Sequence, residues 1–400
     1  MRISLLLFLL GTSLSLLAQS DQEFVIDHTI TSAAFGDERK ITVYLPPAYY
    51  KRPGIKYTVT YVLDGHYSPF IDLVVKAIEY NVNARKITPT IVVGIHAKNR
   101  GAEFSMPQSA DEPQDKRAPA LQAHLRDEVF PLIESLYPTA ADYRSIIGHS
   151  SGGKFVLLTL FSKASDLFNG YLAISPALRP GQQTILEQTE TQLAAGARFP
   201  KFLYCSAGTV GEREFLFGGA VDRLDALLQK YPEHGLIWQQ DRFEGLDHWS
   251  VVAPSVVGGC MAQTRAFRAD VQVVTRLAQA QEKDLTEQLD QFYATNEATY
   301  GFSDLPSAGY LNLAVEELIR LEMPEKALQL YEWALERYPD HFTLTKYQGL
   351  LQQKLGEKTA ARASYQKSLR ILESQKADLD DEEYQAKKQN IQERIKKLGI

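Results

Sequence analysis

The chain has 400 residues, more than one ordinary hydrophobic core organises, so its length predicts two or three domains. Hydrophobic residues make up 44% and charged residues 23%, a balance typical of globular proteins that excludes a largely disordered chain. The formal net charge is −6, and lysine and arginine do not cluster, which argues against nucleic-acid binding.

The first twenty residues differ from everything that follows them. Arg2 precedes two apolar runs, at residues 5–10 and 14–18, and small residues at Ala18 and Ser20 lead into an acidic stretch. This layout is typical of a secretory signal peptide. A retained membrane anchor is the alternative, but it needs a longer apolar stretch. We expect residues 1–20 to be a signal peptide and the mature protein to be exported, periplasmic or secreted, without a membrane span.

Residues 21–275 alternate short strand-like runs with amphipathic helical stretches. One helical stretch, residues 121–136, contains Pro131, which is expected to kink it. Strands alternating with helices predict a mainly parallel sheet covered by helices on both faces. The strand-like runs, rich in β-branched and aromatic residues, are residues 40–45, 57–63, 90–95, 143–147, 170–174, 201–205 and 236–243.

Residues 280–400 are expected to be an all-α domain with an internal repeat. The repeat period is 34 residues (365 minus 331, for instance) and resembles that of tetratricopeptide repeats. Gly356 suits the turn of the second unit, whereas Glu322 occupies that place in the first. Two units are few for a core of their own, so residues 285–300 add a degenerate unit or the array docks on the first domain. Two unrelated helix pairs are the alternative. The matched residues are Leu321, Ala327, Tyr331, Ala334 and Leu335, then Leu355, Ala361, Tyr365, Ser368 and Leu369.

The segment Gly148-His149-Ser150-Ser151-Gly152 carries the clearest chemical signal. It joins a strand-like run to a helical stretch, which is the setting of a nucleophilic serine. A very tight turn holds the serine in strained geometry, and bulky residues two positions before or after it would collide as strand and helix cross. The helix N-terminus behind the serine favours developing negative charge. We expect Ser150 to be a nucleophile rather than part of a structural turn.

A nucleophilic serine needs a base to take its proton, and histidine most often serves. Two of the eight histidines, His234 and His248, follow Ser150 within the sheet-forming region. His248 comes directly after the strand-like run 236–243, so we expect it at the same sheet edge as Ser150. His234 precedes that run and is expected at the opposite edge, in an exposed turn. The sequence therefore predicts His248 as the base.

The third member should be a carboxylate between serine and histidine in the chain, able to fix the imidazole tautomer. Glu212 and Glu214 follow the strand-like run 201–205. We favour Glu212, because glycines just before it let the backbone fold back toward the histidine, and keep Glu214 as the alternative. If a helix already begins here, the two glutamates lie about 200° apart on it, and only one can face His248.

The remaining expected site features are an oxyanion hole and a polar pocket. Backbone N–H groups of Ser151 and of His66, in the loop after run 57–63, are the candidate oxyanion donors. His66, His96 and His149 either line the pocket or are ordinary polar residues at loop edges. No metal or cofactor is expected, because the histidines show no ligand spacing and two cysteines do not complete a site. Cys205 and Cys260 are expected to be separate buried thiols rather than a disulfide.

Several motifs in order resemble a known family, the esterase D and enterochelin-esterase-like esterases. They are an opening strand at 40–47, a Tyr-x-Leu-Asp-Gly strand end at 61–65, a Val-Val-Gly-Ile…Asn-Arg segment within 91–100, the elbow at 148–153 and Asp247-His248. The resemblance covers about residues 24–260. It implies an α/β-hydrolase fold and action on siderophore esters, on feruloyl or acetyl groups of plant polysaccharides, or on S-formylglutathione.

Two features depart from that family pattern. The acid loop offers two glutamates rather than one acid, and Gly101-Ala102-Glu103 replaces an acidic run in a region expected to shape substrate binding. The helical tail implies docking of a protein partner or of a second copy. We expect an exported serine esterase with an acyl-enzyme intermediate. The alternatives are a peptidase or acyltransferase with the same triad, or a non-catalytic binding scaffold that uses the repeats.

Overall fold

The structure is a computed structural model that describes residues 24–51, 55–106, 117–178, 184–280 and 284–399. The expected signal peptide, residues 1–20, lies outside these ranges. None of the helices described in them has the length and apolar character needed to cross a bilayer.

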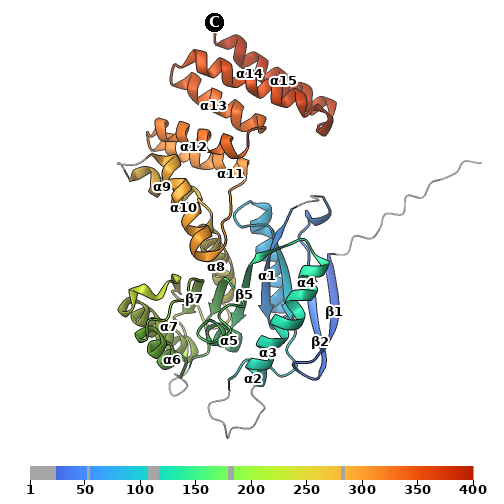
Figure 1. Cartoon of the computed structure of the whole chain (residues 1–400), viewed down its shortest axis with the longest axis vertical. Helices are drawn as coiled ribbons and strands as arrows, with labels where there is room; N and C mark the ends of the chain where they lie inside the picture. The colour runs from blue at the N-terminus through green and yellow to red at the C-terminus, as the bar shows by residue number, and fades with distance from the viewer. Residues whose placement is uncertain (1–23, 52–54, 107–116, 179–183, 281–283, 400) are drawn as a thin grey trace, which may run out of the picture.

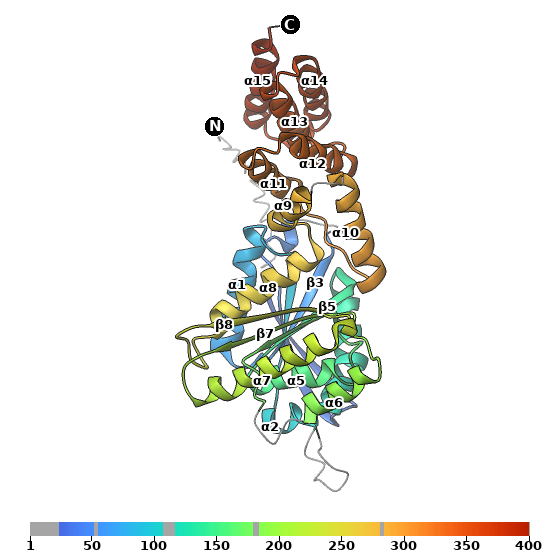
Figure 2. The same cartoon turned by 90° about the vertical axis from the view of Figure 1, so that its left-hand side faces the viewer.

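A mixed sheet runs through the N-terminal part of the described chain (Figures 1 and 2), in the spatial order β1-β2-β4-β3-β5-β6-β7-β8. The β1–β2 and β2–β4 pairs are antiparallel, and every pair from β4 to β8 is parallel. The predicted α/β class with a mainly parallel sheet is confirmed. The strands are β1 (Val25–Ser32), β2 (Asp37–Tyr44), β3 (Tyr57–Leu63), β4 (Thr90–Ile95), β5 (Thr139–His149), β6 (Gly170–Ile174), β7 (Phe202–Gly208) and β8 (Ile237–Phe243).

Helices cover both faces of this sheet because its parallel strands are apolar on both sides. On one face, α1 (Ser68–Asn83) and α8 (Val252–Phe267) pack on a core that includes Val62, Ile147 and Tyr204. The other face buries a larger core. The helices that contribute to it are α3 (Ala118–His124), α4 (Phe130–Leu136), α5 (Ser151–Leu160), α6 (Thr184–Ala194) and α7 (Glu212–Lys230).

A π-helical segment, Leu125–Val129, joins α3 to α4 and accommodates Pro131. The Phe130 N–H donates to the Leu125 carbonyl, one residue further back than in an α-helix. The wider turn lies immediately before the proline, which has no N–H to donate and crowds the preceding turn. The expected irregularity is therefore a local widening within one continuous apolar face.

The turn from β5 into α5 holds Ser150 in a conformation that few non-glycine residues adopt, with φ of 60° and ψ of −115°. A Cβ atom on Gly148 would lie 2.4 Å from the carbonyl carbon and oxygen of Gly152, so residue 148 must be glycine. A Cβ on Gly152 would instead make ordinary contacts, at 3.5 Å or more, with Asp64 and Leu63. The close approach therefore excludes any side chain at residue 148, whereas residue 152 has room for a Cβ atom.

The C-terminal part is helical, as predicted, and keeps the 34-residue period in its helix boundaries. Helix α13 begins 34 residues after α11 (342 minus 308), and α14 begins 34 after α12 (358 minus 324). Glu322 adopts φ of 57° between α11 and α12, and Gly356 adopts φ of 84° in the equivalent turn. The helices are α9 (Val271–Gln279), α10 (Leu285–Tyr300), α11 (Ala308–Arg320), α12 (Pro324–Arg337), α13 (Phe342–Lys354), α14 (Lys358–Ser374) and α15 (Asp381–Lys397).

The segment after α10 attaches the helices to the sheet-containing part. Phe302 packs on Tyr143 of the central strand, with ring centroids 4.2 Å apart. Asp304 forms a buried ion pair with Arg268, at 2.6 Å, and accepts a hydrogen bond from the Thr88 hydroxyl, also at 2.6 Å. Helix α9, by contrast, packs in the core of the C-terminal helices. The chain therefore crosses between the two parts more than once around the boundary expected at 275–280.

The elbow geometry predicts different outcomes for alanine at its two glycines. Gly148→Ala should lower the free energy of unfolding by about 1–3 kcal/mol, because its Cβ overlaps backbone atoms that cannot move independently. Gly152→Ala, the matched control, should change it by less than about 0.5 kcal/mol. Urea denaturation of both variants measures the difference, and equal values would contradict the close approach.

The buried ion pair at the junction predicts a large effect of Asp304→Ala. Removing this carboxylate leaves Arg268, whose side chain is 6% exposed, without its counter-charge, so the free energy of unfolding should fall by about 3–5 kcal/mol. Asp166→Ala is the control, because that aspartate pairs with Arg126 on the surface. Its effect should be at most about 1 kcal/mol. Comparable losses of unfolding free energy in the two variants would show that the Asp304–Arg268 pair is not shielded from solvent.

Candidate active site

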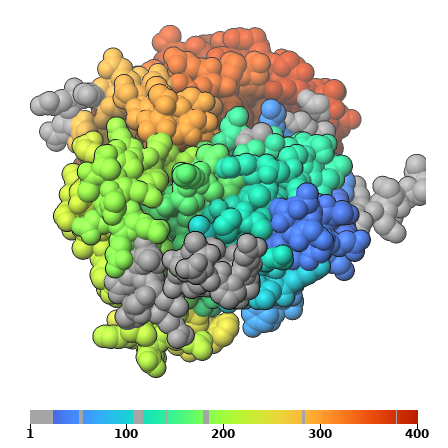
Figure 3. All heavy atoms as spheres, turned by 60° about the horizontal axis from the view of Figure 1, so that its bottom comes forward, coloured from blue at the N-terminus to red at the C-terminus, as the bar shows by residue number. Residues whose placement is uncertain are grey.

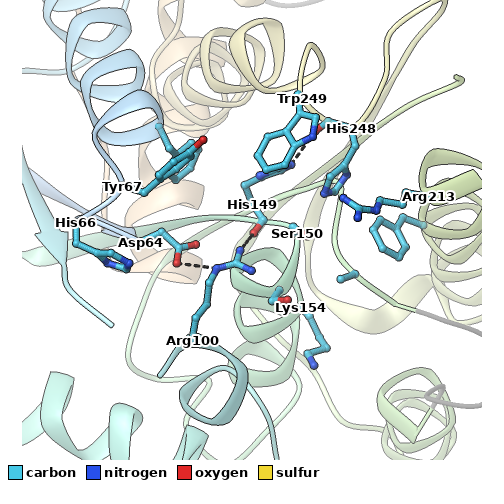
Figure 4. Close-up of a pocket in the computed structure, with 14 residues that line it drawn as sticks. Asp64, His66, Tyr67, Arg100, His149, Ser150, Lys154, Arg213, His248 and Trp249 are labelled. Atoms are coloured by element: carbon cyan, nitrogen blue, oxygen red, sulfur yellow. Dashed lines mark hydrogen bonds and ion pairs between the residues drawn. The ribbon is translucent and has the colours of Figure 1, made fainter. Parts of the chain in front are cut away.

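A cavity of about 570 Å³ lies at the carboxyl ends of the parallel strands and contains the predicted nucleophile and base. It is at the end of the molecule where α2 (Arg100–Glu103) lies, away from the C-terminal helices (Figure 1). Figure 3 views the molecule from this end, with the C-terminal helices behind. The residues that line the cavity are Asp64, His66, Tyr67, Phe70, Arg100, His149, Ser150, Ser151, Lys154, Ala177, Arg213, Phe217, His248 and Trp249 (Figure 4).

A buried carboxylate contacts His248. Glu214 Oε1 lies 2.7 Å from His248 Nδ1, and Glu214 Oε2 accepts a hydrogen bond of 2.5 Å from the Gly208 N–H. The Ser175 hydroxyl donates to the same carboxylate. Burial raises the pKa of Glu214, but the hydrogen bonds from His248, Ser175 and Gly208 outweigh it and leave the pKa below its ordinary value. The carboxylate is therefore held ionised beside the imidazole.

The structure places Glu214, not the favoured Glu212, against His248. Helix α7 begins at Glu212, so Glu212 is exposed in the first turn, whereas Glu214 is fully buried. Residues two apart on a helix are rotated by about 200°, so only one of the two glutamates can face inward. Further along the same helix, Phe215 is 78% exposed, whereas Phe217 is buried.

Ser150 and His248 reach the cavity from different elements. Ser150 is the residue at the β5–α5 turn, and His248 belongs to the loop between β8 and α8. The Glu214 contact occupies His248 Nδ1, which leaves Nε2 as the ring nitrogen available to a hydroxyl. His234 lies in the turn before β8, where its ring accepts from the Leu236 N–H, at the other sheet edge.

The two candidate oxyanion donors both border the cavity. Ser151 is the first residue of α5, where backbone N–H groups have no partner within the helix. His66 follows Asp64 and Gly65, which form a tight turn after β3 in which Asp64 has φ of 60°. A Cβ on Gly65 would lie 2.5 Å from the backbone of Gly94, so the turn packs directly on β4. Their role as donors stays a prediction.

His149 is more closely involved in the site than its sequence position indicated. Its Nε2 donates to the His248 carbonyl at 2.9 Å, and its ring lies 4.5 Å from the His248 ring. Burial, followed by the neighbouring His248, lowers the pKa of His149 to about 4, so the ring is neutral at physiological pH. In the sequence, the position of His149 inside the elbow motif was the feature that indicated a place near the nucleophile. His96 instead lies behind His66, at 6.1 Å between rings, and bonds with Thr42.

Cationic side chains dominate the charge around the cavity. Among the described residues that line it, Arg100, Lys154 and Arg213 are cationic, and the one carboxylate, Asp64, is paired with Arg100 at 2.7 Å. Arg100 also donates to the His149 carbonyl, which ties the α2 loop to the elbow.

Gly101-Ala102-Glu103, the segment that departs from the family pattern, contributes a buried carboxylate that supports the loop beside the cavity. Glu103 is buried in an ion pair with Arg39, at 2.5 Å, and accepts from the N–H groups of Lys98 and Asn99. It braces the loop that carries Arg100, and Arg100 is the residue of this region that reaches the cavity.

Within the described ranges, both cysteines are free thiols, Cys205 on β7 and Cys260 on α8. Burial raises the pKa of the Cys260 thiol to about 12, which keeps it protonated and unreactive. No group of three histidine, cysteine or acidic side chains in the described residues is arranged to hold a metal ion.

Comparison with known proteins identifies the family of this chain. A family model described as "Putative esterase" matches residues 32–302. Ferri-bacillibactin esterase BesA of Bacillus subtilis is 28% identical over 121 residues, which are 26% of this chain and 42% of that protein, so the match spans less than half of that relative.

Solved structures show the same fold. An IroE-like serine hydrolase from Shewanella oneidensis superposes with a TM-score of 0.60 and 21% identity, over 77% of this chain and 98% of the other. An uncharacterised protein from Capnocytophaga ochracea superposes with a TM-score of 0.63 and 18% identity, over 94% of this chain and 99% of the other, so the likeness extends into the C-terminal helices. With the family model matching more than half of its length, the chain belongs to this esterase family.

Proposed function

We propose that this protein is a serine esterase that hydrolyses carboxylic esters through an acyl-enzyme intermediate, with Ser150 as nucleophile, His248 as base and Glu214 as acid. The observation that carries the proposal is the buried Glu214–His248 contact at the cavity into which the strained Ser150 turn opens. An ionised carboxylate on Nδ1 holds the imidazole in the tautomer whose Nε2 accepts a proton.

The reaction follows from these roles. His248 Nε2 takes the Ser150 hydroxyl proton as Ser150 Oγ attacks the ester carbonyl, and the resulting oxyanion accepts hydrogen bonds from the Ser151 and His66 N–H groups. The imidazolium then gives its proton to the leaving alcohol as the carbon–oxygen bond breaks. A water molecule, deprotonated by His248, attacks the acyl-enzyme and releases the acid with Ser150 restored.

Cationic lining favours one of the candidate substrate classes. Arg100, Lys154 and Arg213 attract an anionic ester, and iron-loaded catecholates are negatively charged. The curated relative is a ferri-bacillibactin esterase, which points in the same direction. Exposed aromatic side chains at the rim, Tyr67 and Trp249, offer faces for aryl rings. We therefore propose siderophore-type esters over neutral acetyl or feruloyl esters.

The remaining expectations complete the proposal. Export rests on the signal-like residues 1–20. The 34-residue period supports a tetratricopeptide-like array that docks a protein partner or a second copy. The same triad would serve a peptidase or an acyltransferase, and a non-catalytic scaffold would not need the buried Glu214–His248 contact.

Substitution of the triad tests the proposed chemistry. Ser150→Ala should abolish hydrolysis of 4-nitrophenyl acetate without loss of folding, because its hydroxyl supplies chemistry and little packing. Glu214→Gln should lower kcat by roughly 10³- to 10⁴-fold, since an amide no longer selects the productive tautomer. Glu212→Gln, two residues away and exposed, is the matched control and should stay near wild type. Unchanged turnover in Ser150→Ala would contradict the enzymatic proposal. A larger loss of kcat in Glu212→Gln than in Glu214→Gln would identify Glu212 as the acid.

Substrate charge gives a separate test of the siderophore proposal. Arg213→Ala should raise KM for the anionic 4-nitrophenyl succinate about 2- to 5-fold, the size expected from losing one partly solvated charge. KM for neutral 4-nitrophenyl acetate should not change. Arg223→Ala, on the same helix but away from the cavity, is the control. An equal effect on both esters would mean that Arg213 does not select for charge.

A further inference from the structure

One short segment after β6 contacts all three members of the proposed triad. The Ser150 N–H donates to the Ile174 carbonyl at 2.9 Å, and the Ala177 N–H donates to the Ser150 carbonyl at 2.9 Å. Between these two residues, Ser175 reaches both Glu214 and His248. The segment therefore links the backbone of the nucleophile to the side chains of the acid and the base.

Ser175 is buried and held in an uncommon conformation. It has no exposed surface, and its φ of 40° lies in the left-handed region, which non-glycine residues seldom adopt. Its N–H donates to the Ser206 carbonyl on β7 at 2.8 Å. Its hydroxyl donates to Glu214 Oε1 at 2.5 Å and lies 2.9 Å from His248 Nδ1. The unusual backbone thus aims a buried hydroxyl at the contact between acid and base.

The positions of the protons on His248 and Ser175 determine which hydrogen bonds the Ser175 hydroxyl makes. Catalysis needs the His248 proton on Nδ1, so that Nε2 is free to accept one. The Nδ1–H is then shared between Glu214 Oε1 and Ser175 Oγ, while the Ser175 proton goes to the carboxylate. With the Gly208 N–H on Oε2, Glu214 receives three hydrogen bonds and has one orientation in which all are made. Ser175 contacts both Glu214 and His248, and the three mutual contacts fix the carboxylate relative to the imidazole ring.

We propose that Ser175 is a positioning residue of the esterase site, which holds Glu214 ionised and oriented against His248 and ties that pair to the Ser150 turn. This inference rests on the proposed function, since it assigns a role within the proposed triad. It adds to the triad a buried serine that directly follows a fourth strand, β6, and is not among the residues that line the cavity. The role differs from packing, because deleting one hydroxyl removes two polar contacts and almost no apolar volume.

Ser206 provides a matched control for Ser175. It is equally buried, lies beside Ser175 on the neighbouring strand, and its hydroxyl has no hydrogen-bond partner among the described residues. Ser175→Ala should lower kcat for 4-nitrophenyl acetate roughly 10- to 100-fold with KM nearly unchanged, the effect of losing a hydrogen bond to a charged group. Ser206→Ala should keep kcat within about twofold of wild type.

The pH profile separates positioning from structural support. The acidic limb of kcat/KM reports protonation of the coupled Glu214–His248 pair. Loss of the Ser175 hydrogen bond raises the proton affinity of the carboxylate and with it that of the pair, so this limb moves to higher pH. Among the described residues, the other charged or titratable groups near the pair are His149 on β5, Asp247 in the histidine loop, Arg213 on α7 and Arg242 on β8, which donates to the Gly208 carbonyl, and Ser175→Ala alters none of them. Ser206→Ala should leave the limb in place.

A double-mutant cycle and a spectrum complete the test. In a Glu214→Gln background, Ser175→Ala should lower kcat by about twofold or less, because the carboxylate charge that accepts the Ser175 hydrogen bond is absent. The NMR resonance of the His248 Nδ1 proton should shift in Ser175→Ala and not in Ser206→Ala, whether or not a good substrate is known. Additive losses, an unmoved acidic limb or an unshifted resonance would overturn the positioning role. Full activity of Glu214→Gln alone would instead overturn the proposed acid, and Ser175's role with it.

Discussion

The close approach of Gly148 to Gly152 is the constraint on which the site depends. With 2.4 Å between a would-be Cβ on Gly148 and the backbone of Gly152, β5 and α5 meet without any side chain between them. This contact allows the chain to reverse at Ser150 with φ of 60° and to expose its hydroxyl above the sheet edge. Two further parts of the site are hydrogen-bonded to this turn, Arg100 through the His149 carbonyl and the segment after β6 through the backbone of Ser150.

The sequence was sufficient to predict the fold, whereas it left open which of two glutamates contacts His248. Strands β3, β4 and β6 have the predicted bounds, because their β-branched and aromatic runs are buried on both faces and end at turns. Strand β1 was missed, because it is an edge strand in which exposed residues alternate with partly buried ones, so its composition is mixed. The choice between Glu212 and Glu214 depended on where α7 begins, and helix ends are hard to place from sequence to within two residues.

The sequence analysis missed Ser175 entirely and found His149 without its contact to His248. Ser175 follows β6 with nothing in its local pattern to mark it, and its contacts are 39 and 73 residues away in the chain. A role built from distant contacts and a left-handed backbone angle is visible only in three dimensions. His149 was noticed as a pocket candidate, yet its hydrogen bond to the His248 carbonyl depends on how the loop after β8 returns across the elbow.

The position of the C-terminal helices limits what they do. The proposed catalytic cavity is at the carboxyl ends of the strands, and the described residues that line it all lie between Asp64 and Trp249. A second cavity, of about 640 Å³, lies at the opposite edge, where residues before β3 and β4 meet Leu305, Ala308 and Tyr338 of the helical part. The helices therefore join the sheet at its amino edge, through Phe302 and the Asp304–Arg268 pair. Because this attachment lies at the amino edge, the described residues of the helical part do not line the proposed catalytic cavity, and a partner bound to the helices would position the enzyme away from that cavity.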